Sequence, residues 1–436
     1  MLLSKSTART HLWHPCTQMK DHEILSPLKI VSAKGSYLYT ENGQKIIDAI
    51  SSWWCKSLGH NHLRIKKALI KQIQNFEHVM LANTTNDVIL KLSFKLANLT
   101  KTLKKIFYAS EGSSAVEIAL KMSLHARYNQ EIPQRNKFVT LEKAYHGETV
   151  GALSVSDIAL YSKPYNSILF DSIILKGIPY VQNMEDPLWH DCSSVWNDIE
   201  KQLNENKDQI TAIIIEPIIQ AAAGMLIYSK DFAQKLRSWI KQNNIHLIAD
   251  EIMTGFGRTG LTFACMHANI EPDFMCLGKS LTAGWLPMSA VLTTDDIYDC
   301  FYAEYESGQS FLHSHTHSGN ALAVSVALEA LNIYQDENIY NKAADLQIDL
   351  RRIFYEVAYK TGRLSNIRGI GAVIAADLIG PPNQRLGFRV LEKALKRGAL
   401  LRPLGNTIYW APPLNISSEV LSELQEITYR SILEAY

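Results

Sequence analysis

Ile245-His-Leu-Ile-Ala-Asp250 and Phe274-Met-Cys-Leu-Gly-Lys279 are the two stretches of sequence that decide the fold. Each begins as a continuous apolar run and ends on a charged residue. Runs of this kind, set between helical patterns, are typical of parallel strands that helices cover on both faces. Ligands of such sheets bind beyond the carboxyl ends of the strands. Asp250 and Lys279 are therefore the first functional candidates.

The same pattern continues on both sides of these stretches. Further apolar runs lie at residues 106–109, 138–141, 212–215 and 289–292, and an amphipathic helix is expected over residues 231–242. Apolar strands that alternate with helices indicate an α/β fold around a mostly parallel sheet. We place this sheet in a large domain over residues 61–319.

The two ends of the chain have a different pattern. Residues 29–50 predict a small antiparallel meander, and residues 63–76 and 87–99 predict amphipathic helices. After residue 319 the pattern predicts long helices at residues 321–334 and 339–356, followed by an α+β tail. We expect residues 1–60 and 320–436 to form the two parts of one smaller α+β domain.

Composition excludes several classes of protein. The 436 residues carry a net charge of +1, which gives no global attraction to nucleic acid or to an anionic membrane. No apolar run approaches the roughly 20 residues that span a bilayer. Residues 1–10 lack the apolar core of a secretory signal. The six cysteines form no C-x-x-C pair, which favours reduced thiols and a cytoplasmic protein.

Lys279 and Asp250 have the chemistry of a cofactor site. A lysine after an apolar strand and a glycine would be partly desolvated, which lowers its pKa and frees the amine as a nucleophile. A buried carboxylate needs a partner, and a pyridinium N–H is one that would make the ring an electron sink. The alternatives are a surface lysine, and an aspartate that caps a helix or binds a metal.

Three other segments offer binding groups. Gly112 and Ser113 lead into an amphipathic helix expected over residues 115–128, and the free N–H groups at its start suit a phosphate, although plain capping by serine fits equally well. Tyr145 follows a strand and could stack on a planar cofactor, or could be a core tyrosine. Arg402 could clamp a substrate carboxylate, or form a surface ion pair.

The run His313-Ser-His-Thr-His317 has two interpretations. On a strand, His313, His315 and His317 would share one face and could bind zinc, as in a zinc-dependent hydrolase. No nearby carboxylate or cysteine completes such a site, so we expect no metal. Thr316 offers the segment a second use, as a phosphate contact.

Together these residues resemble the class-III aminotransferases of fold type I. Leu247-Ile-Ala-Asp-Glu-Ile-Met-Thr-Gly-Phe-Gly-Arg-Thr-Gly260, followed by Pro272-Asp-Phe-Met-Cys-Leu-Gly-Lys279, is similar to the signature of that class. Within the class, the chain resembles the branch that acts in biotin synthesis. The segments that carry this resemblance are His11-Leu-Trp-His-Pro, Ser51-Ser-Trp-Trp54, Tyr145-His-Gly-Glu-Thr, Glu216-Pro-Ile-Ile-Gln220, Phe263-Ala-Cys-Met-His267 and Arg402-Pro-Leu-Gly-Asn-Thr-Ile-Tyr409.

The resemblance implies pyridoxal 5'-phosphate as cofactor, a seven-stranded sheet, and a homodimer with shared active sites. It implies that Lys279 holds the cofactor as a Schiff base and shuttles a proton, that Asp250 pairs with the pyridine nitrogen, and that Tyr145 stacks on the ring. The other cofactor-binding residues it implies are Gly112, Ser113, His146, Glu216, His315 and Thr316, the last from the neighbouring subunit. The substrate-binding residues it implies are Cys16, Trp53, Trp54, Tyr145, Arg258, Lys279, Ser314, Arg402 and Tyr409.

The implied reaction aminates 8-amino-7-oxononanoate to 7,8-diaminononanoate in two half-reactions, with S-adenosylmethionine or lysine as the amino donor. The alternatives are a class-III transaminase for ω-amino acids or diamines, and a catalytically silent cofactor-binding scaffold. This chain departs from the usual pattern at four positions. Cys16 replaces a tyrosine, Glu148 an aspartate, Ser314 a glycine and His315 a proline.

Overall fold

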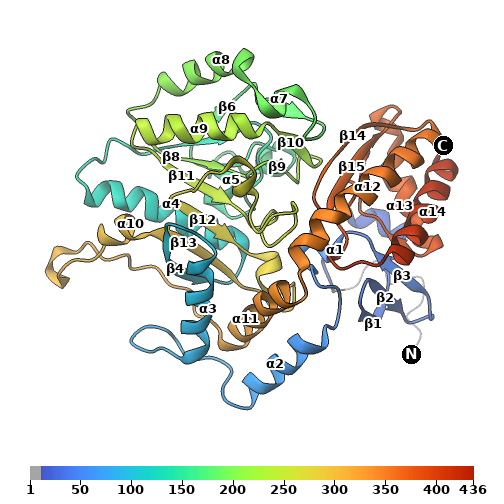
Figure 1. The fold of residues 1–436 in the computed structure, drawn as a ribbon, viewed down its shortest axis with the longest axis horizontal. Coiled ribbons are helices and arrows are strands. Elements are labelled where there is room, and N and C mark those ends of the chain that lie inside the picture. The colour runs from blue at the N-terminus through green and yellow to red at the C-terminus, as the bar shows by residue number, and fades with distance from the viewer. Residues whose placement is uncertain (1–10) are drawn as a thin grey trace.

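The core of the fold is a seven-stranded sheet, seen in a computed structural model that describes residues 11–436 (Figure 1). The absence of a secretory signal was predicted from residues 1–10, which lie outside the described residues. In spatial order the strands are β4 (Leu103–Ala109), β13 (Ser289–Thr294), β12 (Phe274–Leu277), β11 (His246–Asp250), β8 (Ile210–Ile215), β5 (Lys137–Leu141) and β6 (Ile173–Leu175).

The sheet is mostly parallel, as predicted. Only β13 runs antiparallel to its neighbours β12 and β4, while the other adjacent strands are parallel. Asp250 of β11 lies opposite Cys276 of β12, three residues before Lys279. The carboxyl ends of these two strands therefore bring Asp250 and Lys279 to the same edge of the sheet. The three-residue strand β6 was missed, because a run this short has no readable periodicity.

Helices cover both faces of this sheet. Helix α4 (Gly112–Asn129) packs across β13, β12, β11 and β8. The other helices between residues 87 and 299 are α3 (Asp87–Asn98), α5 (Val150–Ser154), α6 (Ala159–Ser162), α7 (Pro187–His190), α8 (Ser193–Asn204), α9 (Lys230–Gln242) and α10 (Asp295–Asp299). A buried sheet explains why the strands are apolar along their whole length rather than alternating.

The chain ends meet in a second region. The meander β1 (Ile30–Lys34), β2 (Tyr37–Thr40) and β3 (Lys45–Asp48) pairs with β16 (Ala399–Leu400), which runs parallel to β3. A separate antiparallel sheet contains β14 (Leu364–Ile370), β15 (Val373–Leu378) and β17 (Thr407–Trp410). Figure 1 shows both sheets beside the two terminal helices, on the right. The domain boundaries at residues 60 and 320 stay a prediction.

The remaining elements connect these layers. A small sheet is formed by β7 (Tyr180–Val181), β9 (Ile219–Gln220) and β10 (Leu226–Tyr228). The other helices are α1 (Ser51–Trp54), α2 (Leu63–Ile73), α11 (Ala321–Asp336), α12 (Ile339–Thr361), α13 (Leu386–Arg397) and α14 (Ser418–Ala435). No helix among residues 11–436 is long and apolar enough to cross a membrane.

Two helix boundaries differ from the predicted ones. The pattern predicts that α4 begins at Ala115, but the helix begins at Gly112, so its first turn lies at the strand end of β4. Helix α12 extends five residues beyond the predicted end, to Thr361, and ends at Gly362 with a φ of 62°. Glycine is favoured there because it adopts the left-handed conformation without a Cβ clash.

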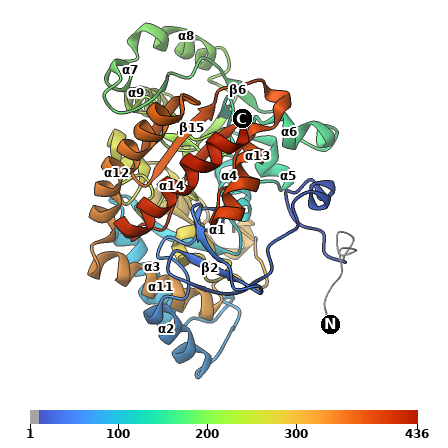
Figure 2. The ribbon, with the colours of Figure 1, turned by 90° about the vertical axis from the view of Figure 1, so that its right-hand side faces the viewer.

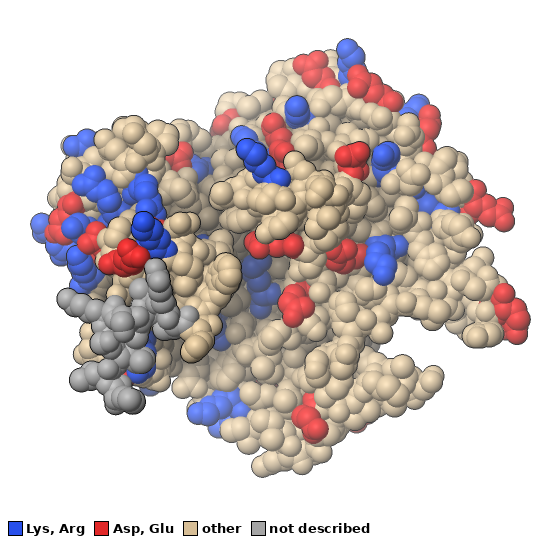
Figure 3. Space-filling view, turned by 180° about the vertical axis from the view of Figure 1, so that it is seen from behind, with Lys and Arg blue, Asp and Glu red and all other residues tan. Residues whose placement is uncertain are grey.

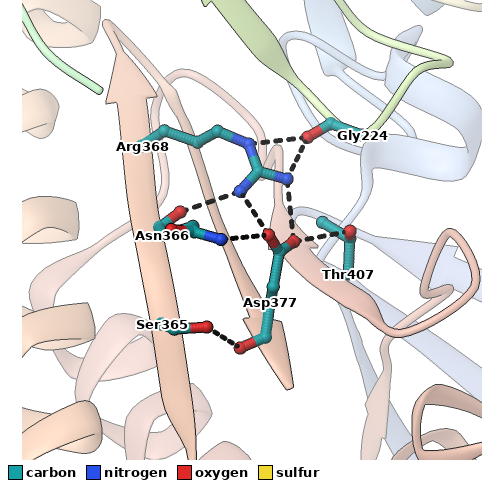
Figure 4. Close-up of polar contacts among 6 residues, drawn as sticks. All are labelled: Gly224, Ser365, Asn366, Arg368, Asp377 and Thr407. Atoms are coloured by element: carbon teal, nitrogen blue, oxygen red, sulfur yellow. Dashed lines mark hydrogen bonds and ion pairs between the residues drawn. The ribbon is translucent and has the colours of Figure 1, made fainter. Parts of the chain in front are cut away.

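Buried Arg368 ties β14 to the loop before β10 (Figure 4). Its Nε and Nη2 atoms donate to the carbonyl oxygen of Gly224, at 2.9 and 2.7 Å. Nη2 also donates to Oδ1 of Asp377 on β15 at 2.9 Å, and Thr407 on β17 donates to the same oxygen at 2.8 Å. One guanidinium thus connects the sheet of β14, β15 and β17 to the loop between β9 and β10.

Candidate active site

Lys279 lines a cavity at the carboxyl edge of the large sheet. The cavity has a volume of 390 Å³ and is also lined by Gly112 and Trp285. Burial lowers the pKa of Lys279, while the negative charge of Asp250 acts in the opposite direction. A lysine with a lowered pKa has more of its amine in the neutral, nucleophilic form. The cavity therefore contains an activated amine, as the sequence predicts.

Asp250 is buried beside this lysine and is held by two partners. His146 Nδ1 lies 2.8 Å from its Oδ2 atom, and the backbone N–H of Ile252 donates to Oδ1 at 3.1 Å. His146 Nε2 is buried, and no partner for it is found among the described residues. A buried carboxylate with only these two partners can still accept a hydrogen bond from a ring N–H.

Glu216 is a second buried acid at the same edge. Burial, followed by the charge of Asp250, raises the pKa of Glu216 to about 8. Its Oε1 atom accepts from the backbone N–H of Tyr145 at 2.9 Å, and Oε2 from that of Ala221 at 3.2 Å. Glu216 is consequently protonated at neutral pH and can donate as well as accept.

The first turn of α4 closes the other side of the cavity. Its N-cap residue, Glu111, makes no side-chain capping hydrogen bond, so the N–H groups of the first turn remain available to a ligand. A Cβ atom on Gly112 would lie 3.0 Å from the side chain of Ile252, and one on Gly278 would lie 3.2 Å from it. Glycine at both positions lets the helix start approach the strand ends closely. Gly112 and Ser113 therefore fit a phosphate.

Trp53 and Trp54 belong to an unusual left-handed turn that places Trp54 near Lys279. All four residues of α1 have positive φ angles, from 44° at Ser52 to 76° at Trp53. The Lys279 Nζ atom lies 5.5 Å from the centroid of the Trp54 ring, and Trp54 Nε1 donates to the hydroxyl of Tyr409 at 3.1 Å. Tyr409 is thus a support for Trp54 in this structure.

The left-handed turn is held by Asp48, which we did not predict as a site residue. Its Oδ1 atom accepts from the backbone N–H of Ser52 at 2.9 Å, and Oδ2 accepts from the Ser52 hydroxyl at 2.6 Å. His60 Nε2 lies 2.8 Å from Oδ2. Left-handed non-glycine residues persist only where the surroundings hold them, and they cluster at functional sites. The sequence carries no signal for this turn, because it contains no glycine or asparagine.

The outer end of the site is formed by one cation, Arg402, and by the aromatic rings of Trp53 and Tyr145. The guanidinium carbon of Arg402 lies 4.2 Å from the centroid of the Trp53 ring, and its Nη2 donates to the backbone oxygen of Cys16 at 3.0 Å. The Tyr145 hydroxyl donates to Glu148 Oε1 at 2.9 Å. Figure 3 shows a hollow on this molecule with lysine or arginine atoms recessed in it. Arg402 is half-buried, so its remaining guanidinium N–H groups are available to a substrate carboxylate.

The side chain of Arg258 is fully buried. Its Nη1 atom donates to the carbonyl oxygens of Pro412 at 2.6 Å and Ala372 at 3.3 Å. Burial lowers its pKa to about 10. No partner is found within residues 11–436 for Nε or Nη2. In this chain Arg258 supports the loops that flank the site.

The segment from His313 to His317 does not join Lys279 and Asp250 within this chain. Lys121 Nζ lies 2.9 Å from His313 Nδ1, and His313 Nε2 lies 3.2 Å from His315 Nε2. The backbone oxygen of Thr316 accepts from His78, whose ring also faces that of His317. Ser314 is exposed. His313 and His315 contact each other while His317 faces His78, and no cluster in the described part of the chain could hold a metal.

Comparison with known proteins identifies the family of this chain. The family model of the class-III aminotransferases matches residues 18–432. A Helicobacter pylori protein named adenosylmethionine-8-amino-7-oxononanoate aminotransferase is 42% identical over 94% of this chain and 93% of its own. The crystal structure of the protein with that name from Methanocaldococcus jannaschii is 32% identical, with a TM-score of 0.89 over 98% of both chains.

A third similarity concerns the cofactor. The crystal structure of an amine transaminase from an uncultivated Pseudomonas species, in its pyridoxal-phosphate-bound form, is 26% identical to this chain. Its TM-score is 0.88, with 98% of both chains covered. The activated lysine, the buried aspartate beside it and the uncapped helix start fit that cofactor. The chain belongs to the class-III aminotransferases, whose cofactor is pyridoxal phosphate.

Proposed function

We propose that this enzyme transfers an amino group to 8-amino-7-oxononanoate and forms 7,8-diaminononanoate. The observation that carries the proposal is the presence of two groups in one site. Lys279 is an amine whose pKa is lowered by burial, and Arg402 is a guanidinium at the outer end of the site. A keto acid with a long chain needs a reacting group at one end and a carboxylate clamp at the other. The names of the relatives support this substrate.

Each residue of the site has its own proposed role. The bound cofactor supplies an electron sink that stabilises negative charge on the reacting carbon. Asp250 keeps a proton on the ring nitrogen, His146 holds Asp250, and Gly112 and Ser113 bind the phosphate. Lys279 Nζ anchors the cofactor and later moves a proton at the reacting carbon. The remaining cofactor contacts that we propose are Tyr145, Glu216, His315 and Thr316.

The proposed substrate contacts lie at the outer end of the site. Trp53 and Trp54 form an apolar wall, and Arg402 binds the terminal carboxylate by charge-assisted hydrogen bonds. Cys16, Tyr145 and Ser314 complete the proposed contacts, and buried Arg258 and Tyr409 serve the substrate site as supports behind them. We further propose a cytoplasmic homodimer with shared active sites. The contacts of the His313–His317 segment support this, because they run to Lys121 and His78 rather than to Lys279 or Asp250 and leave Ser314 exposed.

The main test is product formation from 8-amino-7-oxononanoate with S-adenosylmethionine and lysine compared side by side. We expect diaminononanoate with one of them, S-adenosylmethionine being the donor that we propose. Rescue of a biotin-requiring strain that lacks this enzyme is the second expected result. Failure to rescue, together with activity on ω-amino acids or diamines, would show a different class-III transaminase.

The mechanism is tested separately with Lys279→Ala, which should lose both turnover and the absorbance of the covalently held cofactor. Lys241→Ala, on the exposed side of α9, is the matched control. Normal turnover of the Lys279→Ala protein would exclude the proposed mechanism.

A further inference from the structure

Tyr161 is an aromatic residue at the outer end of the site that the sequence did not single out. It belongs to the short helix α6, whose neighbouring residue Leu160 is 81% exposed, whereas Tyr161 is partly buried. Its ring centroid lies 5.4 Å from that of Tyr145, and its hydroxyl oxygen lies 3.9 Å from Cys16 Sγ. Figure 2 shows the N-terminal segment, in dark blue, passing beside α5 and α6.

Tyr161 and Arg402 converge on the same residue. Cys16 accepts from Arg402 Nη2 through its backbone oxygen, at 3.0 Å, and contacts the Tyr161 hydroxyl through its thiol. A thiol is a weak hydrogen-bond partner for a phenol. The Tyr161 hydroxyl therefore keeps most of its capacity to donate. The Tyr145 hydroxyl differs, because it already donates to Glu148.

The protonation of Tyr161 supports a role as a donor. Burial, followed by the Cys16 thiol, raises the pKa of Tyr161 to about 12, and the positive charge of Arg402 acts in the opposite direction. The phenol is therefore protonated at every pH at which the enzyme would work. It lies within the electrostatic reach of both Arg402 and Glu148.

We propose that Tyr161 is a specificity-determining residue whose hydroxyl donates a hydrogen bond to the substrate carboxylate beside Arg402. This inference rests on the proposed function, which supplies a substrate with a terminal carboxylate. A carboxylate has about four acceptor positions, so one guanidinium leaves room for a second donor. Tyr161 contacts both Tyr145 and the N-terminal segment at this point, so its hydroxyl is held at the outer end of the site.

Tyr161→Phe is the sharpest test, because it removes the hydroxyl and keeps the ring that packs on Tyr145. A lost hydrogen bond to a charged group should raise KM for 8-amino-7-oxononanoate roughly 10-fold or more, with kcat changed less. With the methyl ester of that substrate, which carries no carboxylate, the same variant should match the wild type. A purely structural role of Tyr161 would affect both substrates equally and would overturn the proposal.

Tyr165→Phe is the matched control, because Tyr165 lies four residues further on and is 51% exposed. It should leave both KM values at those of the wild type. If the wild type does not aminate the oxononanoate, the proposed function fails, and the same comparison is made with 6-aminohexanoate and its methyl ester. A carboxylate-specific increase in KM with either pair supports the role of Tyr161, and its absence from both overturns it.

Discussion

His146 holds Asp250 through a contact of 2.8 Å between Nδ1 and Oδ2, with both side chains buried. Asp250 ends strand β11, and His146 lies in the loop after β5, two strands away in the sheet. The pair thus connects two strand ends across β8. A buried carboxylate that loses its partner bears the full cost of desolvation, which is why such a pair orients the carboxylate strongly.

Replacing His146 by alanine should therefore weaken the site without removing Lys279. We expect the loss of this partner to lower kcat roughly 10-fold and to cost about 1–3 kcal/mol in the free energy of unfolding. Steady-state kinetics and urea unfolding measure the two effects. His190→Ala is the control, because that histidine is exposed and forms its hydrogen bond with the backbone oxygen of Met184. Equal activities of the His146→Ala and wild-type proteins would contradict the prediction.

Glu216 makes stability depend on pH. Its folded pKa of about 8 lies above its ordinary value of 4.5, so the folded protein binds one more proton than the unfolded chain between these values. This contribution to stability is fully present below pH 4.5 and is lost as pH rises through about 8. Urea unfolding of the cofactor-free protein at several pH values measures the effect.

Glu216→Gln should abolish this part of the pH dependence, because its side chain cannot titrate. We expect the wild type to lose up to about 3 kcal/mol relative to the variant between pH 5 and pH 8. Glu205→Gln, at the exposed end of α8, should retain the wild-type pH dependence. Parallel curves for the wild type and Glu216→Gln would show that Glu216 is ionised in the folded protein.

Asp48 should control the left-handed turn that carries the two tryptophans. Hydrogen bonds from His60 and Ser52 lower the pKa of Asp48 in spite of its burial. Asp48→Ala removes the acceptor of the turn and leaves His60 without its partner, which should cost about 3 kcal/mol in the free energy of unfolding. Denaturant unfolding tests this, with Asp208→Ala as an exposed control. A loss no greater than that of the control would mean that the turn is held by other contacts.

Arg368 should contribute more to stability than any exposed arginine. Methionine at this position leaves the buried Gly224 oxygen and part of Asp377 without donors, which should cost about 3 kcal/mol. Arg352 forms two exposed ion pairs on one helix, so Arg352→Met should cost less than about 1 kcal/mol. Thermal unfolding of both variants compares them directly, and equal losses would argue against the role of the network.

Several features were predictable because they depend on local patterns. The apolar strands that precede Asp250 and Lys279, and the existence of the helix after Gly112 and Ser113, have signals that lie within a few residues of each other. The antiparallel direction of β13 and the presence of β6 were not predictable in this way. Strand direction depends on the path of the connecting chain, and β6 has only three residues.

The sequence by itself determined the α/β class, the lysine and aspartate of the site, and the family, because each of these is carried by contiguous residues. Only the tertiary structure decided which side chains surround them. Asp48 with His60, His146 with Asp250, and Tyr161 with Cys16 are separated by 12, 104 and 145 residues along the chain. Such contacts depend on how strands and loops pack, which no local periodicity encodes.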